Sequence, residues 1–221
     1  FRRVLFRSSI YLKEKLETYT KEEKKDSIKV VPNGLNKNFL SEKNKELLHS
    51  NKQHKLKKNI IGYFGHLTTA WYDWDLIRKT AKKYPKWTFE IIGFGVSPEK
   101  LNLPNNVVFL GAKKHKEINE IAIRLKVSTI PFTITKLTQG VDPIKIYEYL
   151  ALGLPVVASY MPQIVDYPYT YCYKSHYDFI KSLEKAMNTI VVYKKIEDFL
   201  SDKYWEDRVK QTMELINNVG N

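Results

Sequence analysis

The sequence has very little cysteine and no long apolar run, and both absences exclude whole classes of protein. Cys172 is the only cysteine in 221 residues, which excludes an internal disulfide framework and a zinc site built from several thiolates. No stretch approaches the roughly 18 apolar residues that a membrane-spanning helix needs. No apolar signal-peptide core follows the basic first residues either. We therefore expect a cytoplasmic protein.

Motifs of phosphate chemistry are scarce as well. The chain has no P-loop, and the "GFG" at residues 93–95 lacks the third glycine of a dinucleotide fingerprint, because Pro98 occupies that position. We assign no aspartate pair to a metal. The sequence thus disfavours phosphoryl transfer, and we expect neither a metal nor a bound cofactor.

The sequence also has few acidic residues. It contains 37 lysines and arginines but 24 aspartates and glutamates, which gives a net charge of +13. The lysines are spread along the chain, and the densest basic stretch, residues 51–59, has no interleaved aromatic residues and no glycine–arginine repeats. We therefore expect no nucleic-acid partner. An anionic membrane surface or a phosphorylated substrate suits this charge better.

The first part of the chain differs from the rest. Residues 1–8, "FRRVLFRS", resemble translated adapter sequence, so we expect them to be foreign or artefactual; an ordinary basic strand is the alternative. Residues 8–23 have the apolar spacing of a short helix, and residues 28–36 contain a short strand that ends at Pro32. Residues 36–58 are rich in lysine and asparagine, which predicts a basic linker or surface excursion.

From residue 59 onward, short apolar strands alternate with amphipathic helices. The predicted strands are 59–67, 87–95, 106–112, 127–132, 155–159 and 170–173, and the predicted helices are 73–85, 115–126, 142–153, 176–190 and 202–218. This alternation predicts an α/β fold with a doubly wound, Rossmann-like parallel sheet and helices on both faces. Ligands of such sheets bind at the carboxyl ends of the strands.

The helix predicted over residues 142–153 carries the strongest functional signal. Asp142 is placed as its N-cap, Pro143 at its first position and Gly153 at its end. Lys145 and Glu148 share the side opposite the apolar residues. A lysine in the first turn opposes the helix dipole unless an anion lies nearby. Two interpretations remain open at this point: a ligand-binding pair, or a solvated surface pair.

The residues "DPIKIYEYLALGLPVVAS", at 142–159, resemble the donor-binding segment of GT-B glycosyltransferases, in the bacterial group that builds capsular, teichuronic and related cell-surface polysaccharides. The segments "KVVPNGLNKNF", "IIGYFGHLTTAWYDWDLI", "FEIIGFG", "NVVFLGAKKHKEI", "VSTIPF" and "YWEDRVKQTMELI" match the family in order and spacing. The resemblance implies a transferase that uses a nucleotide-sugar donor. It also implies that Glu148 binds the ribose, that Lys145 faces the diphosphate, and that Gly65 and His66 bring backbone N–H groups or a basic side chain to the same diphosphate.

The resemblance further implies a division of the chain. Residues 9–35 would be the tail of an N-terminal domain and the interdomain boundary, 59–200 the nucleotide-sugar-binding domain, and 201–221 a C-terminal helix that packs back across the cleft. The acceptor site and any catalytic base would lie on an N-terminal domain that this chain lacks, so no catalytic residue is assigned here. The expected partners are the donor and a glycan or lipid-linked acceptor, with possible peripheral contact to an anionic membrane.

The chain also departs from the family pattern. Many retaining members carry two glutamates seven residues apart, and Gly140 occupies the place of the first. Asp142 or residues 138–140 would take over its contacts, and the stereochemical outcome stays open. A nucleotide- or phosphate-binding module without catalysis, and a basic surface binder, are the alternative functions. His49, His54, His115 and His176 show no ligand spacing and are expected at the surface.

Overall fold

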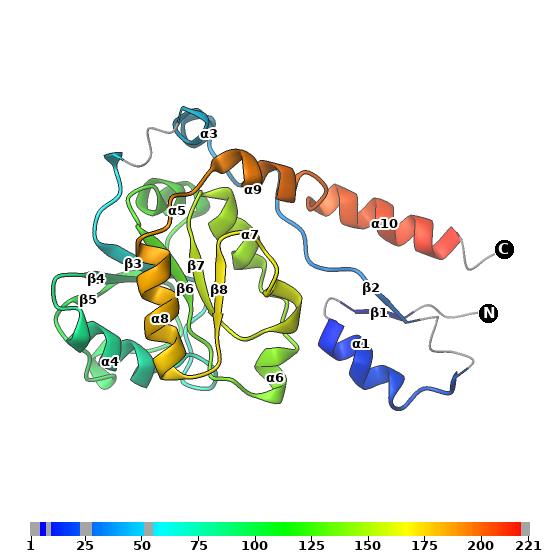
Figure 1. Ribbon diagram of the computed structural model, residues 1–221, viewed down its shortest axis with the longest axis horizontal. Helices are drawn as coiled ribbons and strands as arrows, with labels where there is room; N and C mark the ends of the chain where they lie inside the picture. The colour runs from blue at the N-terminus through cyan, green and yellow to red at the C-terminus, as the bar shows by residue number, and fades with distance from the viewer. Residues whose placement is uncertain (1–4, 8–9, 23–27, 51–54, 218–221) are drawn as a thin grey trace.

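Six parallel strands form the central sheet of the computed structural model, which describes residues 5–7, 10–22, 28–50 and 55–217 (Figure 1). The strand order is β5-β4-β3-β6-β7-β8. The first strand of this sheet, β3, therefore lies in its middle. The next two strands, β4 and β5, are added on one side of β3, and β6, β7 and β8 follow on the other side. The strands are β3 (Ile60–Phe64), β4 (Thr88–Ile92), β5 (Val107–Gly111), β6 (Val127–Ile130), β7 (Val156–Ser159) and β8 (Thr170–Tyr173).

Helices cover both faces of this sheet, as predicted. Helices α4 and α8 lie on one face, where the Tyr84 hydroxyl of α4 donates to the Glu184 carboxylate of α8 at 2.6 Å. Helices α5 and α7 lie on the other face (Figure 1). The bounds are α4 (Trp74–Lys83), α5 (His115–Ala122), α6 (Lys136–Gln139), α7 (Ile144–Ala151), α8 (His176–Met187), α9 (Tyr193–Leu200) and α10 (Trp205–Asn217), with short 3-10 turns η2 (Pro98–Lys100) and η3 (Pro162–Ile164).

The apolar runs of the sequence form these strands because their side chains are buried on both sides. Every residue of β3, β6 and β7 is buried. Strands of this kind read as continuous apolar runs instead of alternating ones. The fold class predicted from the sequence is therefore confirmed.

The early part of the chain forms a separate small sheet. Strand β1 (Leu5–Arg7) pairs in parallel with β2 (Ile28–Val30), and α1 (Ile10–Glu17) lies between them in sequence. This unit lies beside α10, away from the six-stranded sheet (Figure 1). Residues 1–4 and 8 of the stretch predicted to be foreign lie outside the described residues.

The prediction of a solvated linker over residues 36–58 was wrong for much of its length. Helix α3 (Glu42–His49) starts at the N-cap Ser41, whose side chain accepts from the backbone N–H of Asn44. Leu48 is fully buried, and the buried Asn44 amide donates to the Asn119 carbonyl at 3.0 Å. The lysine and asparagine content hid this helix, because its only apolar residues are the adjacent Leu47 and Leu48, which set no helical period. Residues 51–54 lie outside the described part.

The C-terminal helix α10 has the predicted apolar stripe, and the stripe is exposed. Trp205, Val209, Met213 and Ile216 are between 41% and 62% exposed. The start of the helix is joined to the segment before α3, where Leu35 exchanges backbone hydrogen bonds with Lys203 and Trp205 at 2.8 and 3.1 Å. The rest of the helix extends away from the sheet (Figure 1).

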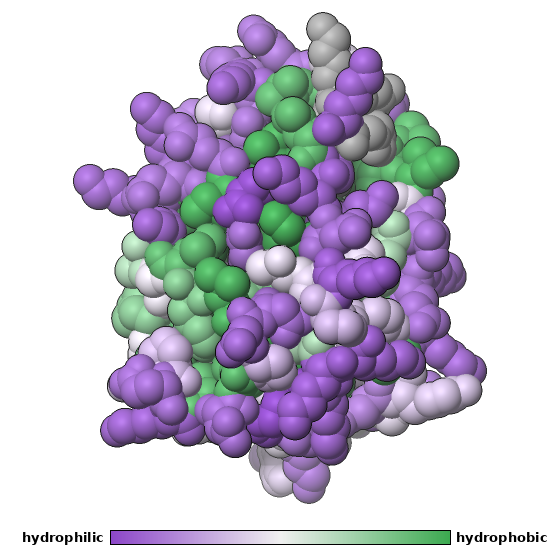
Figure 2. Space-filling model, turned by 90° about the vertical axis from the view of Figure 1, so that its left-hand side faces the viewer, coloured by the Kyte–Doolittle hydropathy of each residue, from purple (hydrophilic) through white to green (hydrophobic). Residues whose placement is uncertain are grey.

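The surface at the β5 end of the sheet is mainly hydrophilic, with apolar side chains in smaller groups between the polar ones (Figure 2). Among the described residues, no helix combines the length and the apolar character that crossing a lipid bilayer requires.

Candidate functional site

A pocket of about 590 Å³ opens at the carboxyl ends of β3, β4, β5 and β6, beside the first turns of α7. This is the edge of the sheet at which the sequence places ligand binding. Five predicted site residues line the pocket: Gly65, His66, Asp142, Lys145 and Glu148. The remaining lining residues are Asn33, Phe64, Ile92, Gly93, Phe94, Ala112, Lys113, His115, Ile118, Phe132, Val141, Pro143 and Ile144.

Lys145 places an ammonium group in an apolar part of this pocket. Its Nζ donates to the Tyr63 hydroxyl at 3.1 Å and lies over the rings of Tyr63 and Phe132, 4.8 and 5.1 Å from their centroids. Burial lowers the pKa of Lys145 to about 8, and the charge of Glu148 offsets part of that effect. Within the described residues no carboxylate lies within 4 Å of this nitrogen. A buried cation without a counter-ion favours an anionic ligand.

Gly65 makes room for that ammonium group. A Cβ at this position would lie 2.8 Å from Lys145 Nζ, and its φ of 147° is a conformation that other residues rarely adopt. The Gly65 N–H, however, donates to the Ile92 carbonyl at 3.0 Å, and the Leu67 N–H donates to the Phe94 carbonyl at 2.8 Å. The Gly65 N–H is therefore already bonded within the protein, and the predicted role of the Gly65–His66 loop at a diphosphate rests on His66. Among the described residues, the backbone N–H of His66 has no hydrogen-bond acceptor, so it is available to donate to a bound diphosphate.

The start of α7 leaves two further N–H groups free. The N-cap is Pro143, not Asp142 as predicted, and no side chain caps the helix. The backbone N–H groups of Ile144 and Lys145 find no acceptor in the described part of the chain, whereas the Ile146 N–H donates to the Pro143 carbonyl at 3.0 Å. Free N–H groups at a helix start attract anions.

Asp142 hydrogen-bonds to Asn33, which lies 109 positions earlier in the chain, and does not cap the helix. Its carboxylate accepts from the Asn33 backbone N–H at 2.6 Å and from the Tyr147 hydroxyl at 3.5 Å. The Asn33 side chain in turn donates to the Asp142 carbonyl at 2.6 Å, and Arg208 of α10 donates to the Asn33 carbonyl at 3.2 Å. Burial raises the pKa of Asp142 to about 6, although the Asn33 hydrogen bond and the Arg208 charge act in the opposite direction. Asp142 thus ties the segment around Asn33 to the pocket wall.

Glu148 lies one turn beyond Lys145 and has a half-buried side chain. Burial raises its pKa, and the charges of His115 and Lys145 lower it again. No side chain or N–H group within the described residues donates a hydrogen bond to this carboxylate. It is therefore available to accept hydrogen bonds from a ligand.

His115 is the pocket residue that the sequence reasoning missed. It is exposed, as expected, but it lines the pocket and acts on the charge of Glu148. Its position as the first residue of α5, just beyond the carboxyl end of β5, was the available signal. Lys113 also lines the pocket, but its ammonium group lies 3.6 Å from the Glu117 carboxylate.

Gly140 does not line the pocket. It is buried and ends α6, with its N–H donating to the Leu137 carbonyl at 3.1 Å. Residues 136–139 are helical because Thr135 and Thr138 cap each other's backbone N–H groups. The predicted loop at this position is therefore a short helix.

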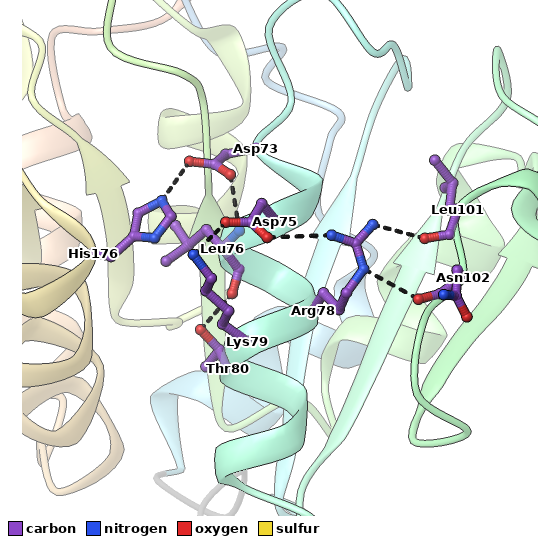
Figure 3. Close-up of polar contacts among 9 residues, drawn as sticks. All are labelled: Asp73, Asp75, Leu76, Arg78, Lys79, Thr80, Leu101, Asn102 and His176. Atoms are coloured by element: carbon purple, nitrogen blue, oxygen red, sulfur yellow. Dashed lines mark hydrogen bonds and ion pairs between the residues drawn. The ribbon is translucent and has the colours of Figure 1, made fainter.

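Asp73 and Asp75 have the spacing of a DxD pair, which the sequence reasoning passed over. Both lie at the start of α4 and outside the pocket lining (Figure 3). Asp73 caps the helix by accepting from the Leu76 N–H at 2.8 Å, and its other oxygen lies 2.9 Å from His176 Nε2. Asp75 pairs with Lys79 at 2.6 Å. Among the described residues no three His, Cys, Asp or Glu side chains form a group that could hold a metal ion.

The pocket as a whole combines apolar walls with a few convergent polar groups, as small-molecule sites do. The Lys145 ammonium group and the N–H groups of His66, Ile144 and Lys145 can hold an anion. Glu148, one helical turn away, can orient a hydroxylated group beside that anion.

Comparisons with known proteins agree with this geometry. A family profile described as "Glycosyl transferases group 1" matches residues 58–189, more than half of the chain. A Bacillus subtilis (strain 168) protein named as a teichuronic acid biosynthesis glycosyltransferase, TuaH, is 30% identical over 139 residues, covering 58% of this chain and 34% of TuaH. A glycosyltransferase of Haemophilus influenzae is 26% identical over 184 residues, covering 74% of this chain and 50% of that protein. The chain thus spans half or less of these curated relatives.

Solved glycosyltransferase structures share the architecture. The lipopolysaccharide outer core galactosyltransferase WaaB has a TM-score of 0.68 at 15% identity, over 97% of this chain and 62% of WaaB. HepE of Anabaena, in complex with UDP and glucose, has a TM-score of 0.66 at 16% identity, over 99% of this chain and 63% of HepE. The sucrose-phosphate synthase of Thermosynechococcus elongatus has a TM-score of 0.71 at 14% identity, over 97% of this chain and 57% of that enzyme. This chain therefore belongs to the group 1 glycosyl transferases and has the GT-B type of fold.

Proposed function

We propose that this chain binds a nucleotide-sugar donor and serves as the donor-binding part of an enzyme that transfers the sugar to an acceptor hydroxyl in bacterial cell-surface polysaccharide synthesis. The observation that carries the proposal is the buried Lys145 ammonium group, which has no carboxylate partner among the residues that the structure describes and lies beside two N–H groups of α7 that find no acceptor there. The UDP complex of HepE and the name of TuaH support the class of donor and product.

Each polar group has a role in this proposal. Lys145 and the N–H groups of His66, Ile144 and Lys145 hold the diphosphate. They also stabilise the charge that develops on it as the sugar departs, because fixed dipoles in an apolar pocket need no reorganisation. Glu148 accepts hydrogen bonds from the ribose hydroxyls, and His115 helps to keep that carboxylate ionised. The donor is the only small molecule that this scheme requires.

The acceptor side of the reaction is proposed to lie outside this chain. Since the chain spans between 34% and 63% of the relatives described above, we propose that the acceptor site and any general base belong to the part of those proteins that it does not match. We accordingly expect this chain to bind the donor without measurable transfer. The acceptor is a glycan or a lipid-linked molecule, and a lipid-linked acceptor would place the enzyme at the cytoplasmic side of a membrane, in peripheral contact with its anionic surface.

Replacing Glu148 by glutamine is expected to weaken donor binding about 10- to 100-fold, because a charge-assisted hydrogen bond contributes about 1.5–3 kcal/mol. Isothermal titration calorimetry with UDP-glucose and a panel of other UDP- and GDP-sugars measures the effect. Glu120→Gln, an exposed change on α5 outside the pocket, is the matched control and should leave the affinity unaltered. Unchanged affinity in Glu148→Gln, or no binding of any nucleotide sugar to the native chain, would contradict the proposal.

Donor affinity is expected to fall as the pH rises above 8. The pKa of Lys145 is lowered to about 8 in the free protein, and a bound diphosphate raises it again. Binding is therefore at full strength below about pH 8, and the dissociation constant should rise about tenfold between pH 7 and pH 9. In Lys145→Arg the guanidinium group stays charged, so its profile over the same range should be flat. A flat profile in the native chain would show that Lys145 does not hold the diphosphate.

A further inference from the structure

An outer face of the molecule carries lysines paired with tyrosine rings instead of carboxylates. Lys185 of α8 lies over Tyr171 of β8 at 5.1 Å, Lys181 lies over Tyr177 at 4.4 Å, and Lys195 of α9 lies over Tyr169 at 5.7 Å. These six residues are called the lysine–tyrosine face below. It lies along β8, which is the last strand in the order of the six-stranded sheet.

The six residues form one continuous surface. Tyr171 lies within β8 and Tyr169 immediately precedes it, and the ring of each lies beneath a lysine of α8 or α9. Positions 177, 181 and 185 follow each other at intervals of four along α8, which places them on one side of that helix. The Tyr171 hydroxyl lies 2.7 Å from the Thr189 hydroxyl, and the Val192 N–H donates to the Tyr169 hydroxyl at 3.0 Å. The segment between α8 and α9 is thereby joined to the strand.

The positive charge of this face is not neutralised within the described chain. Lys181, Lys185 and Lys195 have no carboxylate within 4 Å, whereas Lys194 beside them pairs with Asp198 at 2.8 Å. The acidic residues of α8 are engaged elsewhere. Glu184 accepts from Tyr84 of α4, and Asp178 accepts from Ser175. Three exposed ammonium groups thus remain free for an anionic partner.

Apolar side chains project from the same region. Ile190 is 79% exposed and Val192 is 58% exposed, both in the turn between α8 and α9, and Tyr177 is 67% exposed. Aliphatic tips flanked by lysines and tyrosines suit the interface of a bilayer, where apolar groups enter the lipid and cations meet its headgroups.

We propose that the lysine–tyrosine face, with Ile190 and Val192, docks on an anionic lipid bilayer. A single-stranded nucleic acid fits less well, because such ligands stack on open aromatic rings. Here lysines lie over the rings, and the hydroxyls of Tyr169 and Tyr171 are already hydrogen-bonded within the protein. The inference supplies a surface for the membrane contact proposed above. None of its residues lines the donor pocket, so donor binding and docking can fail separately.

Sedimentation with lipid vesicles tests the proposal. The native chain should bind vesicles that contain phosphatidylglycerol, bind pure phosphatidylcholine weakly, and be released from the former in large part, but not fully, by high salt. The triple variant Lys181→Gln, Lys185→Gln, Lys195→Gln should bind about 100-fold more weakly, since each lysine near an anionic surface contributes about fivefold. Changing Ile190 and Val192 to serine should reduce the binding that persists at high salt.

A matched triple variant removes the same charge elsewhere. Lys82, Lys86 and Lys100 are exposed lysines in or near α4 and η2, and their change to glutamine should leave most of the vesicle binding intact. Thermal midpoints verify that both triple variants are folded. Equal losses in the two variants, binding that ignores phosphatidylglycerol, or displacement of the vesicles by single-stranded RNA would overturn the proposal.

Discussion

Replacing Lys145 by methionine is expected to weaken binding of UDP-glucose, or whichever nucleotide sugar binds the native chain, by about 30-fold or more. Removing one partner of a buried charge pair costs about 2–5 kcal/mol, because the other charge is left without its counterpart in an apolar site. Methionine keeps the length and the packing of the side chain against Tyr63 and Phe132. The loss therefore reports on the charge, and titration calorimetry at pH 7 measures it.

The thermal stability of Lys145→Met should stay the same or increase, although its affinity for the donor falls. The Lys145 ammonium group is buried without a carboxylate, and this burial lowers its pKa, so it costs stability in the free protein. Lys145→Met should therefore unfold at an equal or higher temperature than the native chain, as is common where a binding site holds an unfavourable group. Lys113→Met is the control within the pocket, and because that lysine already pairs with Glu117 it should change affinity less than threefold. A lower thermal midpoint together with near-native affinity would make Lys145 a structural residue.

Replacing Gly93 by alanine is expected to destabilise the fold by about 4 kcal/mol, through steric overlap and backbone strain acting together. A Cβ at Gly93 would overlap the carbonyl oxygen of Gly65, and Gly93 has a φ of 153°. Both partners of this contact are backbone at the ends of β4 and β3, so neither can move without shifting a strand end. For a chain of this size the unfolding temperature should fall by about 8–16 °C.

Gly111→Ala provides the comparison that separates overlap from backbone strain. Gly111 has a φ of 70°, and a Cβ there would meet nothing within 4 Å. Only the cost of the left-handed conformation remains, about 1 kcal/mol, which corresponds to a fall of about 2–4 °C. Scanning calorimetry of both variants measures the difference. Similar midpoints for the two would show that the close approach of Gly93 to Gly65 is not tight in the folded protein.

Local patterns in the sequence were sufficient for the sheet and for α7. Continuous apolar runs such as β3 and β7 are diagnostic because both of their faces are covered. Helix α3 escaped detection because lysine and asparagine dominate its composition. What buries it is Leu48 and the contact of Asn44 with Asn119, a residue 75 positions away.

The site shows the same division. The sequence placed Lys145 and Glu148 one turn apart at the ligand-binding edge of the sheet, and the structure brings both into the pocket with Gly65 and His66. The sequence could not show which backbone N–H groups of the pocket lack an acceptor within the protein. The Gly65 N–H belongs to the contact with β4, and that contact exists only once the strands are paired.

By itself the sequence determined the succession of the six sheet strands, their parallel arrangement, and the helix start at which an anion can bind. These features follow from the spacing of apolar residues and from the alternation of strand and helix, and both can be recognised within a few neighbouring residues. Only the tertiary structure decided that Asp142 bonds to Asn33, that His115 acts on Glu148, and that the Lys145 ammonium group has no carboxylate partner. Such relations join residues tens of positions apart, and the packing that buries them sets both their partners and their pKa values.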